Sequence, residues 1–149
     1  MHDHTWIAAH IPHQGKMCLL DAVLAWSPEH IHCQATSHQA PDNPLRAAGR
    51  LGAAAGIEYA AQAMAVHGAL LAAADDPARQ GYLTSVRGVS LHAARLDDCC
   101  GPLDVQAERL SGDDNHILYQ FTVSHAGQPL LSGRAAVILD ASLLENTSS

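Results

Sequence analysis

The stretch LGAAAGIEYAAQAMAVHGALLAAA, residues 51–74, decides the fold of this 149-residue chain. Eleven of its residues are Ala and three are Gly, and Glu58 is the only one that carries a formal charge. Small apolar side chains on nearly every side predict a long helix that is buried in protein, where neighbouring backbone can approach closely. The length would suffice to cross a membrane, but Glu58 and Gln62 lie inside and Ala outnumbers Leu, Ile and Phe, so we expect no membrane span.

Glu58 is the first candidate for a functional residue. Charged side chains are almost never fully buried unless they are paired, so a lone carboxylate on an apolar helix calls for an explanation. The structural explanation is that Glu58 lies on a narrow exposed edge of the helix. No other charged residue in the stretch marks such an edge, and we therefore favour a catalytic task.

Segments with the alternating pattern of strands flank this helix. We expect hairpin turns at residues 27–30, 111–115 and 126–128 and a bulge at Gly88. The expected strands are residues 17–26, 31–37, 81–96, 103–110, 117–125 and 129–139. We therefore expect a single α+β domain over residues 1–149, with its core in 5–139 and a frayed tail in 140–149. Its architecture is one long central helix wrapped by an antiparallel sheet of about five to six strands. One sheet covers only part of the helix, which predicts a homodimer or a higher assembly of dimers.

Composition and charge limit the classes of partner and the cellular compartment that we expect for this chain. The net charge of −7, with eight Lys and Arg, argues against a nucleic-acid or anionic-membrane partner. The four Cys residues lack the C-x-x-C spacing of zinc or redox sites, so we expect no metal and a reducing compartment. The N-terminal segment lacks the pattern of a secretory signal, which predicts a cytoplasmic protein.

Two short motifs stand out in the chain. One is residues 11–13 (IPH), followed by 17–21 (MCLLD) and Val23, and the other is residues 56–62 (GIEYAAQ), with Glu and Gln four positions apart. They resemble the opening motif LPHR-x-P-hLLVD-x-V and the helix motif hIEAhAQ of the β-hydroxyacyl-acyl-carrier-protein dehydratases, a family with the hotdog fold. A narrower resemblance, to the divergent dehydratase-like branch of aryl polyene and pigment biosynthesis clusters, is carried by SHQAPDNPLR (37–46), GIEYAAQAMAVHG (56–68) and GYLTSVRGVSLH (81–92).

The resemblance implies dehydration of a 3-hydroxyacyl thioester, carried on the phosphopantetheine of acyl carrier protein, to the trans-2-enoyl thioester, without a further cofactor. Such a reaction needs a base, an acid and donors for the thioester oxygen. We assign the acid to Glu58, and to Gln62, one turn later, the orientation of Glu58 or of the substrate. Backbone N–H groups of Gly52 and Ala53 at the helix start are the expected oxygen donors, and Pro12 lines the acyl site.

The base is the open question, because the family's GHFPG loop places its His fourteen positions before the helix Glu, where this chain has Pro44. We prefer His13, in the Pro-His motif, with His38 as the alternative. At least one of them should lie within about 7 Å of the Glu58 carboxylate. His67, His92, His116 and His125 are expected to be packing or surface residues.

Two other functions fit the same residues. In a hotdog thioesterase, Glu58 would activate water or attack the thioester carbonyl. In a heterodimer with a related dehydratase, this chain would be the non-catalytic subunit and its partner would carry the active His. If the protein is an enzyme, either a dehydratase or a thioesterase, Arg46, Arg50 and Arg87 are candidates for contacts with the phosphopantetheine phosphate or the acidic carrier protein.

Overall fold

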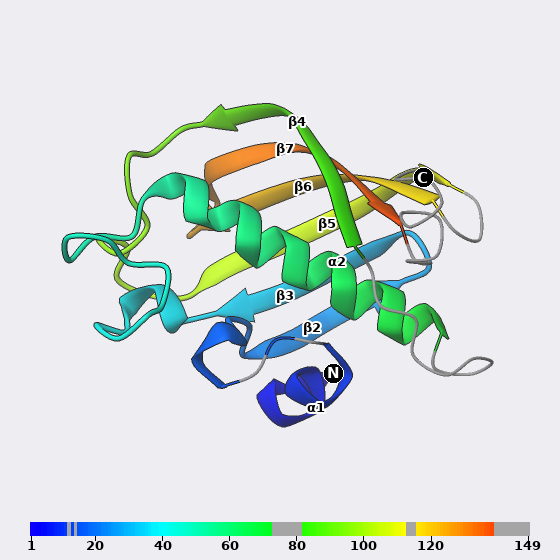
Figure 1. Cartoon of the computed structure of the whole chain (residues 1–149), viewed down its shortest axis with the longest axis horizontal. Helices are drawn as coiled ribbons and strands as arrows, with labels where there is room; N and C mark the ends of the chain where they lie inside the picture. The colour runs from blue at the N-terminus through cyan, green and yellow to red at the C-terminus, as the bar shows by residue number, and fades with distance from the viewer. Residues whose placement is uncertain (12, 14, 73–81, 113–115, 139–149) are drawn as a thin grey trace, which may run out of the picture.

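One antiparallel sheet curves around one long helix (Figure 1). The structure is a computed structural model that describes residues 1–11, 13, 15–72, 82–112 and 116–138. Its seven strands follow the order β1-β2-β3-β5-β6-β7-β4. Their bounds are β1 His2–Asp3, β2 Ala22–Ser27, β3 His30–Ala35, β4 Tyr82–Leu91, β5 Leu103–Gly112, β6 His116–His125 and β7 Gln128–Ile138.

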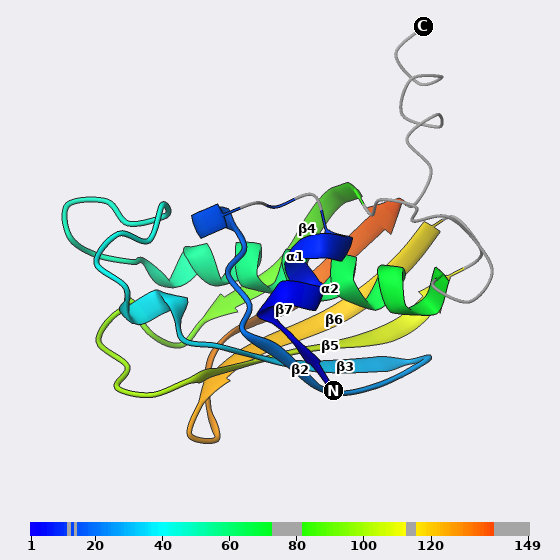
Figure 2. The same ribbon diagram turned by 90° about the horizontal axis from the view of Figure 1, so that it is seen from below.

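The helices are the short α1 (His4–His10) and the long α2 (Gly56–Ala72), with single 3₁₀ turns at η1 (Gly15–Met17), η2 (Ser37–Gln39) and η3 (Ala53–Ala55). Helix α2 lies against one face of the sheet, and no helix of the described residues covers the other face (Figure 2). The predicted helix and its wrapping sheet are thus confirmed. The expected helix end at residues 73–74 and the tail at 140–149 lie outside the described residues.

The core forms between α2 and the facing side of the sheet. On β6, Ile117, Tyr119, Phe121 and Val123 alternate with more exposed residues, and all four are buried. This period of two is the pattern that predicted the strands. The alternate positions of β6, such as Gln120 and Thr122, face the other side of the sheet and are more exposed.

Gly56 sets how closely α2 approaches the sheet. A Cβ atom at this position would overlap Cδ2 of Leu131, a fully buried side chain on β7. A larger residue therefore fits here only if the Leu131 side chain moves. The first turn of α2, which carries Glu58, is therefore seated directly on β7.

Three differences from the expected elements concern strand number and strand ends. The sheet has seven strands because the two-residue β1 pairs with β2, and α1 follows it, in a segment expected to be a plain lead-in. The first expected strand begins at Ala22 instead of residue 17, and β4 ends at Leu91 instead of residue 96. The expected bulge at Gly88 is confirmed, because the register shifts between Arg87 and Ser90 and Gly88 has φ +61°.

Strand β4 forms one edge of the sheet and has no neighbour on its outer side within the described residues. It is ten residues long and exposes Leu83, Val89 and Leu91. A long apolar edge strand is a template for pairing with another chain. Across the described ranges, no helix has the length and apolar character needed to cross a membrane.

Candidate functional site

Glu58 lies in the first turn of α2 with a half-buried side chain. Among the described residues its carboxylate has no hydrogen bond and no ion pair, whereas the Asp97 carboxylate, for example, is held by Arg95. The position combines partial burial with a free carboxylate. It therefore has the properties of a group that is kept available for a ligand.

The residue after Glu58 joins α2 to the loop that follows β3. The Tyr59 hydroxyl donates to Oγ of Ser37 at 2.8 Å and accepts from the Asn43 side-chain amide at 3.1 Å. The Ser37 hydroxyl in turn donates to the Leu19 carbonyl at 2.8 Å. Tyr59 is fully buried, and burial raises its pKa, so it remains a neutral hydroxyl. This network fixes residues 37–43 beside the first turn of α2, with His38 and Glu58 each one position from it.

His38 is fully buried in η2. Its Nε2–H donates to the Cys99 carbonyl at 3.1 Å, and its Nδ1 is buried without a hydrogen-bond partner. Burial lowers the pKa of His38, so the ring is neutral near pH 7. A neutral ring whose Nε2–H is fixed by a carbonyl carries its free lone pair on Nδ1, which is the state required of a base.

His13, the preferred base, is half-buried, and its Nδ1 is also buried without a partner. Pro12, expected to line the acyl site, lies outside the described residues. Both candidate imidazoles thus have an unused nitrogen. The expected approach of one of them to Glu58 stays a prediction.

Gln62 does not hydrogen-bond to Glu58. Its Oε1 accepts from the Leu19 N–H at 2.8 Å, and its Nε2 donates to the Met17 carbonyl at 2.6 Å. The side chain is fully buried. The two hydrogen bonds of Gln62 connect the segment before β2 to α2.

The donors at the helix start differ in part from those expected. The Ala53 N–H is occupied, because it donates to the Ala94 carbonyl at 3.1 Å, so Ala53 is corrected as an oxygen donor. Gly52 and Ala54 are exposed, and their N–H groups have no partner among the described residues. Ala53 and Ala54 could not be distinguished from the sequence, since the difference between their N–H groups arises from the short bridge between Gly52 and Arg95.

Arg46 has a structural role within the loop. Its guanidinium donates to the carbonyls of His38 and Gly49, both at 3.1 Å, and lies 3.8 Å from the Asp97 carboxylate. Arg95 holds the pKa of Asp97 well below its usual range, so this carboxylate is charged at neutral pH. Of the three arginines considered for phosphate contacts, Arg50 and Arg87 are exposed, and Arg46 is engaged in holding the loop.

A pocket of about 720 Å³ lies elsewhere, among β4, β6 and β7, and its lining includes neither Glu58 nor the two candidate histidines. In the described ranges, His, Cys, Asp and Glu side chains nowhere gather in threes that would suit a metal ion. The Cys18 and Cys33 side chains are buried, as expected for small apolar residues.

Comparison with known proteins gives a family match over most of the chain. Residues 5–146 match the ApeP-like family, described as ApeP dehydratase. The chain is similar to the dehydratase heterocomplex ApeI:P from Xenorhabdus doucetiae, with 26% identity, a TM-score of 0.81, and coverage of 96% of this chain and 97% of that one. No curated protein matches the sequence.

Two further structures share the fold at low sequence identity. Zebra fish thioesterase superfamily member 2 has 11% identity and a TM-score of 0.64, with coverage of 92% of this chain and 95% of that one. A hypothetical thioesterase from Streptococcus pneumoniae, determined with coenzyme A, has 11% identity and a TM-score of 0.59, with coverage of 80% and 84%. The central helix and wrapping sheet are thus those of the hotdog fold.

Proposed function

Because this chain belongs to the ApeP dehydratase family, we propose that it serves in the dehydration of a 3-hydroxyacyl thioester to the trans-2-enoyl thioester. The substrate is carried on the phosphopantetheine of acyl carrier protein, in cytoplasmic fatty-acid-like or polyene biosynthesis. The observation that carries the proposal is the free, half-buried carboxylate of Glu58 in the first turn of α2.

The elimination needs two proton transfers around one substrate. A base removes the proton at C2 while an acid gives a proton to the hydroxyl at C3, which leaves as water and creates the C2–C3 double bond. Glu58 takes the role of the acid. The thioester oxygen gains negative charge during proton removal, and the unpartnered N–H groups of Gly52 and Ala54 at the start of η3 are suited to hold it.

The base is His13, with His38 as the alternative. His13 is the more accessible ring, and its buried Nδ1 lacks a partner. His38 is the better oriented ring, because the Cys99 carbonyl fixes its tautomer, but it is fully buried and a substrate would need a passage to it. Replacing each ring separately decides between the two.

A heterodimer is the second candidate, and similarity to the ApeI:P heterocomplex favours it. In this form the chain pairs with a related dehydratase whose His completes the site, and Glu58 faces the shared substrate. The exposed apolar edge of β4 suits either a second copy of this chain or such a related partner. Activity of the purified chain alone favours the homodimer, and activity only after mixing favours the heterodimer.

The test uses a 3-hydroxyacyl thioester on acyl carrier protein, with enoyl absorbance and free thiol measured together. We expect enoyl absorbance without thiol release, and a loss of about 10²–10⁴-fold in turnover for Glu58→Gln. Glu29→Gln, at an exposed turn, makes the same charge change and should keep full activity. Thiol release without enoyl product would show a thioesterase, and full turnover of Glu58→Gln would remove Glu58 from the chemistry.

A further inference from the structure

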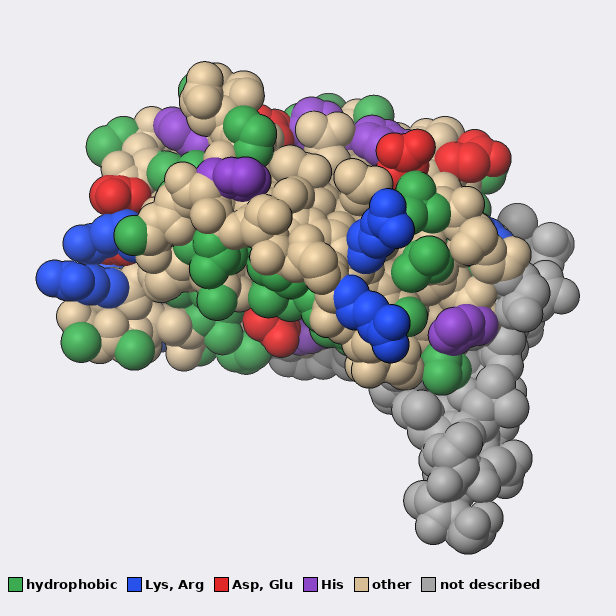
Figure 3. Space-filling view, turned by 90° about the horizontal axis from the view of Figure 1, so that it is seen from above, with side chains coloured by type: hydrophobic (Ala, Val, Ile, Leu, Met, Phe, Trp, Pro, Cys, Tyr) green, Lys and Arg blue, Asp and Glu red, His purple; other side chains and the backbone are tan. Residues whose placement is uncertain are grey.

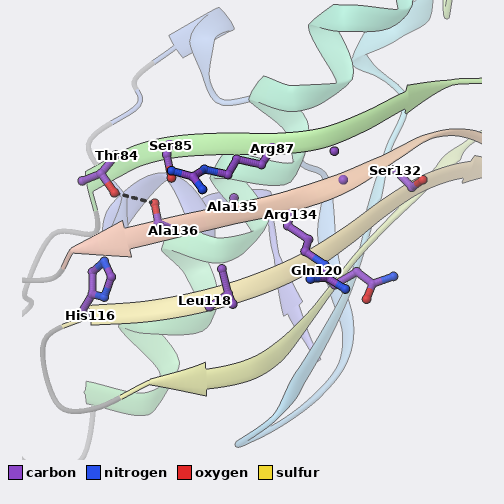
Figure 4. Close-up of a pocket in the computed structure, with 12 residues that line it drawn as sticks. Thr84, Ser85, Arg87, His116, Leu118, Gln120, Ser132, Arg134, Ala135 and Ala136 are labelled. Carbon is purple, nitrogen blue, oxygen red and sulfur yellow. Dashed lines mark hydrogen bonds between the residues drawn. The ribbon is translucent and has the colours of Figure 1, made fainter.

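The pocket between β4, β6 and β7 lies on the face of the sheet opposite α2, away from Glu58. Phe121 is buried in the core and pairs in register with Gly133, so both positions face α2. Successive residues of a strand face opposite sides, so Gln120 and Arg134, one position along, face outward. Figure 4 shows these outward side chains with α2 behind the sheet. None of the lining residues is Asp or Glu.

Two arginines stand directly opposite one another in this pocket. Arg87 on β4 pairs in register with Arg134 on β7, and Arg134 pairs with Gln120 on β6, so the three side chains form a row across three strands. Both arginines are exposed. Figure 3 shows basic side chains close together to the right of the centre of the face seen from above. Like charges opposite each other on one sheet face destabilise the sheet.

No carboxylate of the described residues neutralises this pair. Lys16 is paired with Asp42, and Arg46 and Arg95 share Asp97, but neither Arg87 nor Arg134 lies within ion-pair distance of a described acidic side chain. The chain has fifteen acidic residues against eight Lys and Arg. Two unpaired arginines side by side are therefore unexpected in this protein, and they point to an anion from outside.

We propose that this pocket binds an organic phosphate, with the phosphate group between Arg87 and Arg134. Guanidinium groups bind phosphate oxygens through paired N–H donors, and two of them match a group with about two negative charges. The side chains of Gln120, Ser85 and Ser132 line the same space and supply further donors.

The size of the pocket favours a phosphate that is part of a larger molecule. Its volume of about 720 Å³ lies within the range of small-molecule sites and exceeds what a free phosphate needs. Leu118 and Ala136, opposite one another on β6 and β7, give it an apolar part. The site is separate from Glu58, so it goes beyond the proposed dehydration and is tested independently of it.

The experiment is calorimetric titration of the full chain with three probes: pyrophosphate, coenzyme A, and pantetheine, which lacks phosphate. We expect pyrophosphate and coenzyme A to bind, coenzyme A more tightly because of the apolar part, and pantetheine to show no binding that depends on Arg87 or Arg134. Arg87→Gln and Arg134→Gln should each weaken binding of both phosphates by about tenfold, and the double variant should abolish it.

Three controls separate this site from charge in general and from the proposed active site. Lys16→Gln removes one positive charge from an exposed side chain outside the pocket and should leave pyrophosphate affinity unchanged. Glu58→Gln should also leave it unchanged. Without ligand, Arg134→Gln should unfold at the same temperature as the natural protein or a higher one, because it removes a like-charge pair.

Several outcomes would overturn the proposal. One is that neither phosphate binds, and another is that Lys16→Gln weakens binding as much as Arg134→Gln. Equal affinities for pyrophosphate and coenzyme A would show that the pocket recognises the phosphate alone and not an organic group attached to it. If an acidic carrier protein binds in an Arg87- and Arg134-dependent manner while both phosphates do not, the face is a protein docking surface instead.

Discussion

Glu58 and Gln62 lie one turn apart on α2, but their side chains have different surroundings. Glu58 is half-buried without a partner, whereas Gln62 is fully buried with both ends of its amide bound to the backbone at residues 17 and 19. The resemblance to dehydratases placed both in the active site. The structure separates a side chain that remains available from one that holds two segments together.

Replacing Gln62 by Met, which has a similar volume, tests this structural role. The Leu19 N–H and the Met17 carbonyl would then lose their partner beside a buried side chain. We expect the free energy of unfolding to fall by about 3 kcal/mol, because each unsatisfied polar group costs about 1–3 kcal/mol. Denaturant titration measures it, with exposed Gln39→Met as the control, expected within about 0.5 kcal/mol of the natural protein. An equally small effect for Gln62→Met would show that the amide bonds contribute little.

The sequence predicted Glu58 as a functional candidate because charge and apolar context are both local properties. The partners of Gln62 were out of reach, since they are main-chain atoms more than forty positions away that only the folded chain brings close. The same holds for the Ala53 N–H, whose acceptor at Ala94 lies in a different part of the chain.

At the scale of elements, the period of the side chains predicted most of the strands, and their ends were less predictable. Strand β6 and the first half of β5 alternate between buried and more exposed positions, so their pattern could be recognised. Helix α1 was not predicted because it has only seven residues, and polar side chains occupy both of its ends, at His4, Thr5 and His10. Its one local signal is Asp3, whose carboxylate accepts from the Trp6 N–H as an N-cap.

The seating of α2 on β7 gives a prediction at this scale. In Gly56→Ala, the new methyl group would meet three atoms of Leu131, which is fully buried and has little room to move. We expect a net loss of about 1–3 kcal/mol in the free energy of unfolding, which outweighs the higher helix propensity of Ala. Thermal and denaturant unfolding measure it.

Gly52→Ala is the matched control for Gly56→Ala. Gly52 has φ −64°, which any residue adopts, and a Cβ atom there has no neighbour within 4 Å. It should unfold like the natural protein. If Gly56→Ala is as stable as Gly52→Ala, α2 is not held against Leu131 as closely as described.

At the scale of the whole molecule, two buried histidines predict how stability depends on pH. His67 accepts from the Tyr119 hydroxyl through Nδ1 and donates through Nε2 to the Ser27 carbonyl, both at 2.7 Å, so it is held neutral. Burial lowers the pKa of both His67 and His38 in the folded protein. Because the unfolded chain then binds protons more readily, their contribution is fully present above about pH 6.5 and is lost as the pH falls below it.

We therefore expect the midpoint of denaturant unfolding to fall between about pH 7 and pH 5, with a slope of up to two protons. His67→Gln keeps a donor and an acceptor without a titrating ring, and should reduce this slope by about one proton. His92→Gln, on an exposed position, should not change it. A slope that is the same in His67→Gln would mean that His67 is not held neutral.

The edge strand β4 predicts assembly. Leu83 on this strand is 39% exposed, and Leu110 on β5, a strand inside the sheet, is 41% exposed, so the two sites differ in position more than in exposure. A charge on an edge strand opposes pairing with another strand. We expect Leu83→Lys to shift the protein from dimer to monomer, whereas Leu110→Lys stays dimeric. Light scattering coupled to gel filtration measures this, both for the chain alone and for its mixture with a related dehydratase chain. If Leu83→Lys remains dimeric, the chains meet at another surface, and the edge of β4 is not the place where the site is completed.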